Sequence, residues 1–531
     1  MNGRVVLRGG TVVDGSGGAL RTVDVAVDGD QIVEVGVVPA RADDHVVDCS
    51  GRYLLPGLID AHTHADGKVF DPDVAAALLS QGVTTVIAGQ DGVSYAPGDG
   101  RYGSEYFAAI NGPHPTYKGG GVAALLESYD GTTPVNVGYL VPHGTVRHEV
   151  MGYSSRTATD DELRQIAGLA RVGLEEGALG VSTGLDYAPG YFADTAELIE
   201  FCRPAAEVGA IYVSHMRGGY EGNSPTGVEE VCAISRTTGV SSHISHFHAP
   251  ASLVASLVDD ACASGIDLSY DAYPYRRGCS LLAMPMLPPE LLKLGTVEAA
   301  RHLRDPAIRA KVLREWIPVM EKRPDIGLDW ARGITMAYVS AEEYKWAEGL
   351  SLEKAASSVR EHPAEFGMKM MAASDLAVSI VFMVPNQRPL EDIGALLTHR
   401  CHVGSSDGIY IGGHPHPRAW GSFARFLGLY ARERSDYTWA QTAVHLSART
   451  AARHCLGDRG RIEPGFAADI VVLDPALISD NATYEDPKVP ATGVCDVLVN
   501  GAVVFHEGEL TGVNSGRGLR RTSKVVKVSD R

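Results

Sequence analysis

Short apolar segments with strand character alternate with amphipathic helical segments from residue 57 to residue 455. The apolar segments end in polar residues and lie at 58–61, 83–88, 135–141, 179–182, 211–214, 242–245, 266–270 and 401–405. Helical patterns lie between them, for example at 160–176 and 194–208. Repeated strand–helix units build a parallel sheet, and this number of units predicts an α/β fold of the (β/α)8 TIM-barrel type. A doubly wound sheet is the less favoured alternative, because no glycine-rich dinucleotide turn follows the early strands.

Both ends of the chain have a different pattern, with short strands separated by glycine-containing turns. Strand patterns occur in the first fifty residues and return at 469–473, 496–501 and 503–505. A few short strands cannot enclose a core alone, so the two ends are expected to pair with each other. We therefore predict a composite small β-domain from residues 1–56 plus 456–531, and a barrel from residues 57–455.

Composition and charge narrow the range of partners. The formal charge of −18 argues against binding nucleic acid, because a phosphate-binding surface needs an excess of basic residues. No apolar stretch is long enough for a membrane span, and the N-terminal residues do not resemble a signal peptide. The eight cysteines are scattered singly, which is typical of reduced thiols and predicts a cytoplasmic protein. A homo-oligomer is compatible with the sequence, which does not fix the oligomeric state.

Histidine and aspartate residues follow the predicted barrel strands, at the end where barrel enzymes carry their active sites. They are His62 and His64 after the first strand, Asp91 after the second, His143 after the third, His215 and His246 after the fifth and sixth, and Asp407 after the last. Alone, such an aspartate is more often a helix cap, and such a histidine is more often structural. Together they predict a metal site, and nitrogen and carboxylate ligands suit Zn²⁺, with Mn²⁺, Fe²⁺ or Co²⁺ as alternatives.

The chain resembles the amidohydrolase superfamily and, within it, the D-aminoacylase (N-acyl-D-amino-acid deacylase) family. The supporting motifs are PGLIDAHTH at 56–64, STGLDY at 182–187, SHMR at 214–217, ISH at 244–246, DAYPY at 271–275, GSSDG at 404–408, PHPRAWG at 415–421 and GRIEPGFAAD at 460–469. The resemblance implies hydrolysis of an N-acyl-D-amino acid by metal-activated hydroxide, giving a carboxylate and a D-amino acid. The implied cofactor is one or two Zn²⁺ ions, and the implied partner is a small amide.

The resemblance also implies a role for each candidate residue. His215 and His246, with Asp91, would hold the principal metal, and His62 and His64 would hold a second, with Asp91 as a bridge. Asp407 would be the general base, with pure metal ligation as the alternative. Substrate-binding roles fall to Arg418, Tyr275, His248 and His143. For Arg418 the alternative is a structural salt bridge, for Tyr275 it is packing, and His143 is expected behind the ligands rather than among them.

Two positions depart from the family pattern. The family usually has cysteine in a Gly-Asn-Cys-Gly motif where this chain has Asp91, and often lysine where it has His248. A carboxylate is a harder ligand than a thiolate, and a histidine is less fully charged than a lysine. An alternative function is therefore hydrolysis of a different amide, such as a D-dipeptide, a cyclic amide or an acylated specialised metabolite. A non-catalytic scaffold is a weaker alternative, because the candidate ligands and Asp407 are all retained.

The segment 95–121 is rich in glycine and tyrosine and fits no barrel element. Loops of this kind above a barrel commonly shape access to the active site. An oligomer contact or a solvated insertion is an equally good interpretation.

Overall fold

A closed barrel of parallel strands forms the centre of the molecule. The computed structural model describes residues 3–323, 326–327, 329–384 and 387–522. In this part of the chain the barrel strands follow one another in chain order around the sheet. They are β6 (Leu58–Asp60), β7 (Val83–Ala88), β8 (Asn136–Pro142), β9 (Gly180–Gly184), β10 (Ile211–His215), β11 (Ser241–Ile244), β12 (Leu268–Ala272) and β16 (His402–Gly404). The predicted (β/α)8 barrel is confirmed, with every strand close to its expected position.

The first and last strands meet at a seam that closes the barrel. The amide of Asp407 donates to the carbonyl oxygen of His62 at 2.8 Å, and the amide of His64 donates to Gly408 at 2.9 Å. The buried Asp60 carboxylate accepts from the amide of Ser406 at 2.8 Å and so ties the two strand ends together. The seam therefore places His62 and His64 directly beside Asp407.

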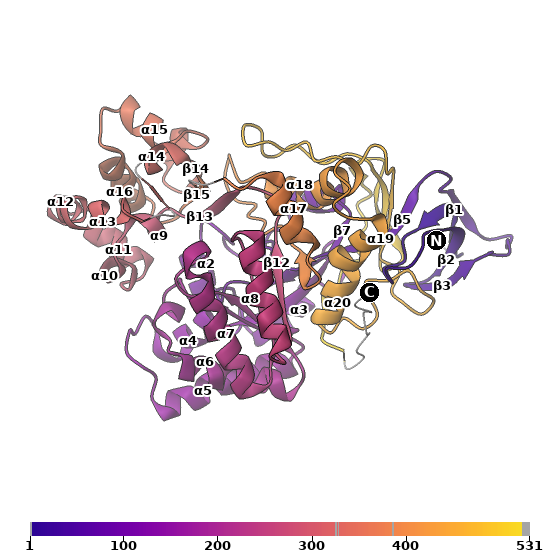
Figure 1. Cartoon of the computed structure of the whole chain (residues 1–531), viewed down its shortest axis with the longest axis horizontal. Helices are drawn as coiled ribbons and strands as arrows, with labels where there is room; N and C mark the ends of the chain where they lie inside the picture. Colours follow the sequence, from indigo (N-terminus) through magenta and orange to yellow (C-terminus); the bar gives the residue numbers. More distant parts are fainter. Residues whose placement is uncertain (1–2, 324–325, 328, 385–386, 523–531) are drawn as a thin grey trace.

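Helices cover the outside of the barrel (Figure 1). They are α1 (Pro72–Leu79), α4 (His143–Met151), α5 (Asp160–Glu175), α6 (Thr195–Glu207), α7 (Ser224–Thr238), α8 (Ala251–Ala263), α17 (Leu390–Thr398), α18 (Arg418–Arg425), α19 (Trp439–Ala443) and α20 (Arg449–Arg453), with the π-helical segments η4 (Phe426–Glu433) and η5 (Val444–Ala448) near the end. None of the helices in the described ranges combines the length and apolar character needed to cross a membrane.

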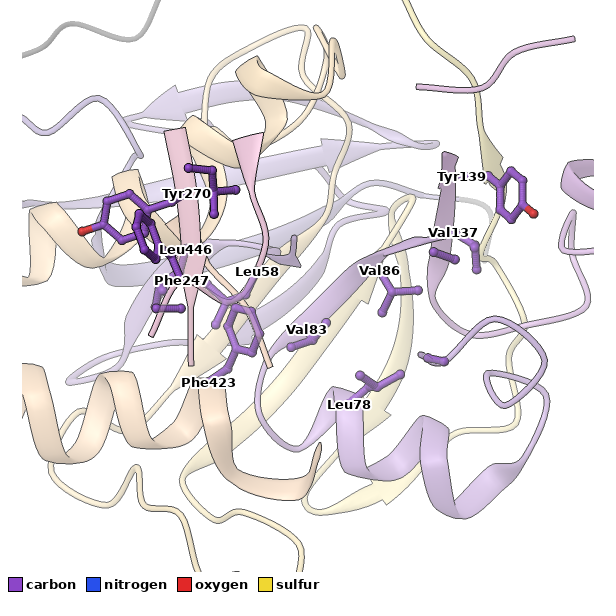
Figure 2. Close-up of a cluster of buried hydrophobic side chains, with 14 of the residues drawn as sticks. Leu58, Leu78, Val83, Val86, Val137, Tyr139, Phe247, Tyr270, Phe423 and Leu446 are labelled. Atoms are coloured by element: carbon purple, nitrogen blue, oxygen red, sulfur yellow. The ribbon is translucent and has the colours of Figure 1, made fainter. Parts of the chain in front are cut away.

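The strands are apolar on both faces because each face is buried. In β8, Val137 and Tyr139 pack in the large core under the helices, whereas Leu140 packs with Ile87 and Ile211 inside the barrel. This alternation follows from the two-residue period of a strand. Figure 2 shows the outer layer, where Val83, Val86 and Val137 of the strands lie near Leu78 of α1. The strand ends are thereby fixed in rigid, densely packed structure.

The two ends of the chain share a second sheet, as predicted. Its strands are β1 (Val5–Val12), β2 (Arg21–Asp28), β3 (Gln31–Gly36), β4 (His45–Asp48), β5 (Tyr53–Pro56), β17 (Ile470–Leu473), β18 (Val494–Val499), β19 (Ala502–His506) and β20 (Glu509–Leu510). The two groups join where β5 pairs antiparallel with β17. The predicted boundary differs in one respect, because β21 (Gly518–Leu519) pairs with β8 of the barrel instead of with this sheet.

An insertion between β12 and β16 has its own core, at upper left in Figure 1. Its sheet has the order β13 (Arg277–Leu281), β15 (Val378–Met383), β14 (Ile334–Val339). Its helices are α9 (Ala283–Met286), α10 (Pro289–Leu292), α11 (Thr296–Leu303), α12 (Pro306–Glu315), α13 (Ile317–Met320), α14 (Trp330–Gly333), α15 (Leu352–Ser358) and α16 (Pro363–Ala373). These residues were expected in the barrel, since short strands and helices give the same local pattern in either setting.

Candidate active site

Asp91 lies at the centre of the candidate metal ligands. Its Oδ1 is 3.5 Å from Nε2 of His62, 3.7 Å from Nδ1 of His215 and 3.4 Å from Nε2 of His246. Its Oδ2 is 3.5 Å from Nε2 of His64. The five residues thus form two overlapping groups of three that share Asp91.

The donor atoms of these residues suit a divalent metal. Both ring nitrogens of His62 and Oδ1 of Asp91 are buried, and within the described residues they have no hydrogen-bond partner. Leaving buried polar atoms unpaired is costly, so a site of this kind points to a bound ligand. Imidazole nitrogens around a carboxylate are a typical set for Zn²⁺ and neighbouring transition metals. Burial alone would raise the pKa of Asp91, but the nearby His62 and His246 outweigh it and hold that pKa well below its usual value.

The backbone is strained at three of the site residues. Asp91, His246 and Asp407 have φ values of 55°, 32° and 47°, in the left-handed region that non-glycine residues seldom adopt. Gly184 at the end of β9 allows Asp91 to approach, because a Cβ at this position would lie 1.9 Å from the Asp91 carbonyl oxygen. Backbone strain of this kind is concentrated at functional sites, where the surrounding structure imposes it.

Three residues that the sequence analysis did not single out orient the ligands. Asn111 Oδ1 is 3.0 Å from Nδ1 of His64, and Asp186 Oδ2 is 3.2 Å from Nε2 of His215. Asp271 accepts from the backbone amide of His246 at 2.9 Å. Asp186 and Asp271 belong to the STGLDY and DAYPY motifs, so a signal for both was present in the sequence.

Asp407 and Arg418 form a buried ion pair beside the candidate metal ligands. Asp407 Oδ2 is 2.8 Å from Nη2 of Arg418, and its Oδ1 is 3.5 Å from Nε2 of His64. Burial raises the pKa of Asp407, but the Arg418 charge outweighs this effect and the pKa is about 2. Arg418 is 1% exposed, and its Nε and Nη1 have no hydrogen-bond partner in the described structure. The site thus holds an ionised carboxylate next to a guanidinium with free donors.

Tyr273, which was not among the predicted substrate-binding residues, lies against Arg418. The Arg418 guanidinium lies 4.4 Å from the centre of the Tyr273 ring. Tyr275 packs against His416 and Arg425 and lines a separate cavity of about 200 Å³. His416 Nδ1 accepts from the backbone amide of Arg418 at 2.9 Å, so it shapes the loop that presents Arg418.

The remaining two predicted substrate-binding residues have different surroundings. The His248 ring lies 4.2 Å from the Tyr273 ring, and its Nδ1 is 2.8 Å from Nη2 of Arg388. Burial and the Arg388 charge hold the pKa of His248 well below its usual value. His143 contacts Glu197 at 2.9 Å and packs on Phe201, so these contacts are structural and do not involve the candidate metal ligands.

The segment 95–121 lies over the His64 side of the site. It contains α2 (Arg101–Tyr106) and ends at the first residue of α3 (Gly121–Glu127). Phe107 makes an edge contact with His64 and packs 4.9 Å from Tyr187, and Asn111 bonds His64. These contacts favour the interpretation that the segment shapes the active site.

Comparison with known proteins gives one family. The chain matches the family model described as "Amidohydrolase family" over residues 45–256 and 329–505. It is 32% identical to a D-aminoacylase of Alcaligenes xylosoxydans xylosoxydans, covering 98% of each chain, and 32% identical to an N-acyl-D-glutamate deacylase of the same organism, covering 98% and 97%.

Solved structures agree with the sequence matches. A D-aminoacylase crystal structure has a TM-score of 0.81 at 30% identity, covering 98% of this chain and 99% of that one. An N-acyl-D-glutamate deacylase from Bordetella bronchiseptica, solved with zinc and a phosphonate mimic of the tetrahedral intermediate, has a TM-score of 0.81 at 29% identity, covering 97% and 99%. The donor cluster at the strand ends and these matches together show that the chain belongs to the amidohydrolase family, with D-aminoacylase and the N-acyl-D-glutamate deacylase among its relatives.

Proposed function

We propose that this protein is a zinc-dependent deacylase that hydrolyses N-acyl-D-amino acids to a carboxylate and a D-amino acid. The observation that carries the proposal is the pair of donor groups sharing Asp91, set beside the Asp407–Arg418 ion pair. Amide hydrolysis needs a nucleophile, a proton carrier and a group that binds the substrate. The donor groups would hold the metal that activates water, Asp407 would carry the proton, and Arg418 would bind the substrate. The D-configuration is taken from the relatives.

The five ligands divide into two positions. Asp91, His215 and His246 would hold the principal metal, and His62 and His64, together with Asp91, would hold a second. Asn111 and Asp186 fix the ring orientations of His64 and His215 from behind. A divalent ion in this site would lower the pKa of a water molecule to about 7 and polarise the amide carbonyl.

Asp407 would accept the proton of the attacking water and return it to the leaving amine. Its Oδ1 faces the ligand His64, whereas its Oδ2 faces Arg418. Arg418 would bind the substrate carboxylate through donor nitrogens that lack a protein acceptor, by charge-assisted hydrogen bonds. The same pair of residues thereby places the amide next to its proton carrier.

The test measures metal content and substrate range on one preparation. Elemental analysis is expected to find one or two zinc ions per chain, and a panel of N-acyl-D- and N-acyl-L-amino acids is expected to show turnover of D-substrates. Metal binding without turnover of any D-substrate would contradict the proposal and favour a different amide as substrate.

A further inference from the structure

Arg388 connects the insertion to the candidate site. It lies between β15 and α17, where the chain returns from the insertion to the barrel. Its Nη2 is 2.8 Å from Nδ1 of His248, and its Nη1 donates to the carbonyl oxygen of Ala249. Carboxylate oxygens of Glu221 and Asp392 lie 3.9 Å from the guanidinium. The side chain is therefore held from several directions with one edge against His248.

The contact with Arg388 determines which His248 nitrogen carries the hydrogen. A guanidinium has only donors, so Nδ1 of His248 must accept, and a neutral imidazole then carries its hydrogen on Nε2. This Nε2 is shielded from solvent and has no hydrogen-bond partner among the described residues. A buried donor left unpaired by the protein points to an acceptor on a ligand.

His248 and Arg418 contact the same tyrosine ring. The His248 ring is 4.2 Å from Tyr273, and the Arg418 guanidinium is 4.4 Å from it. Each contributes donors without a protein acceptor, Nε2 of His248 and Nε and Nη1 of Arg418. Such a group of donors suits a carboxylate, which accepts several hydrogen bonds at once.

We propose that Arg388 is a positioning residue that fixes His248 as an Nε2–H donor in the carboxylate subsite formed with Arg418. The inference rests on the proposed function, which supplies the carboxylate. The Nε2–H of a neutral His248 then occupies the position where related enzymes often have a lysine. The positive charge lies on Arg388, on the Nδ1 side of the imidazole. Arg388 therefore acts on substrate affinity through His248 and leaves the metal ligands unchanged.

The kinetic test compares three variants on two substrates. Arg388→Gln is expected to raise KM for N-acetyl-D-leucine about tenfold, the cost of weakening one hydrogen bond to a charged group, with kcat and zinc content unchanged. Arg388→Lys, which can still donate to Nδ1, is expected to restore part of the loss. The control Arg434→Gln removes a guanidinium that pairs with Glu391 of α17 and does not touch His248, so KM should stay at the wild-type value.

The second substrate is N-(3-methylbutyl)acetamide, which lacks the carboxylate. Its kcat/KM is expected to be the same in wild type and Arg388→Gln. An unchanged KM for N-acetyl-D-leucine, an equal loss on both substrates, or a fall in kcat together with zinc content would overturn the proposal.

Nitrogen-15 spectra of the histidines provide a readout that does not depend on activity. With the His248 signal assigned by loss in His248→Gln, the wild type is expected to show the Nε2–H form, and Arg388→Gln is expected to show a mixture of forms. A wild-type Nδ1–H form would overturn the proposal. An enzyme that turns over no N-acyl-D-amino acid would instead contradict the proposed function, and these spectra would still decide the role of Arg388.

Discussion

Nη2 of Arg418 lies 2.8 Å from Oδ2 of Asp407, so the residue proposed to bind the substrate also neutralises the residue proposed to carry the proton. Both side chains are almost fully buried, and an unpaired charge of either sign would be strongly disfavoured there. Substitution of one partner therefore affects the other. This coupling determines which substitutions separate catalysis from metal binding.

Asp407→Asn is expected to lower kcat by about 10² to 10⁴, the usual contribution of a positioned acid or base, and to leave zinc content nearly unchanged. The amide cannot accept the proton, but it preserves the shape of the side chain. Elemental analysis and steady-state kinetics on the same sample check this. A loss of zinc in proportion to the loss of activity would identify Asp407 as a metal ligand instead.

Asp91 should control both metal affinity and metal choice. Asp91→Ala removes the only residue shared by the two donor groups, so the zinc Kd should rise by more than the roughly 100-fold that loss of an outer-shell partner costs. Asp91→Cys should retain zinc and shift the preference away from Mn²⁺, because a thiolate is the softer ligand. Competition titrations measure both effects. If wild type and Asp91→Cys show the same preference for zinc over manganese, residue 91 does not bind the metal directly.

Asn111→Ala is expected to weaken only the metal position that uses His64. The amide oxygen is 3.0 Å from Nδ1 of His64, and losing such an outer contact typically costs 10- to 100-fold in metal affinity. A zinc titration of the variant should show two binding steps, only one of which is weaker than in the wild type. Asn481→Ala, which removes an exposed amide bonded to Pro490, is the matched control and should bind zinc like the wild type.

The segment over the site should lose stability in mild acid because of His114. Its Nδ1 accepts from the amide of Tyr117 at 2.9 Å, and burial, together with nearby Lys118, lowers its pKa to about 4. Because the unfolded chain has the ordinary pKa of about 6.5, it binds the proton more readily, so stability falls as pH decreases from 6.5 to 4. Between pH 6.5 and pH 4, this difference in pKa should lower the free energy of unfolding by about 3 kcal/mol.

Thermal unfolding of wild type and His114→Asn between pH 7 and pH 4 measures this contribution. Asparagine can still accept from the Tyr117 amide but does not titrate in this range, so the wild type should lose more stability than the variant as pH falls. If the stability of both proteins falls equally with pH, His114 is not the source of the acid sensitivity.

The barrel and the positions of the candidate ligands were predictable because their signals are local. Each barrel strand is a short apolar run, and the residue after it lies at the strand end whichever helix follows, so Asp91 and Asp407 could be placed from the sequence alone. Contacts that depend on loop conformation could not. Tyr273 and Tyr275 are two residues apart in one motif, and only the path of the loop decides that Tyr273 meets Arg418. Arg388 and Asn111 come from connecting loops, which carry no periodic pattern.

The seam between β6 and β16 has a consequence for how the protein folds. Thr63 and Gly408 are hydrogen-bonded there although they are 345 residues apart in the chain. Contacts of such long range are entropically costly and are expected to form late in folding. His62, His64 and Asp407 sit on this seam, so a chain still emerging from the ribosome lacks the proposed proton carrier beside its candidate metal ligands until the last strand is made. The complete active site should therefore form only at the end of folding.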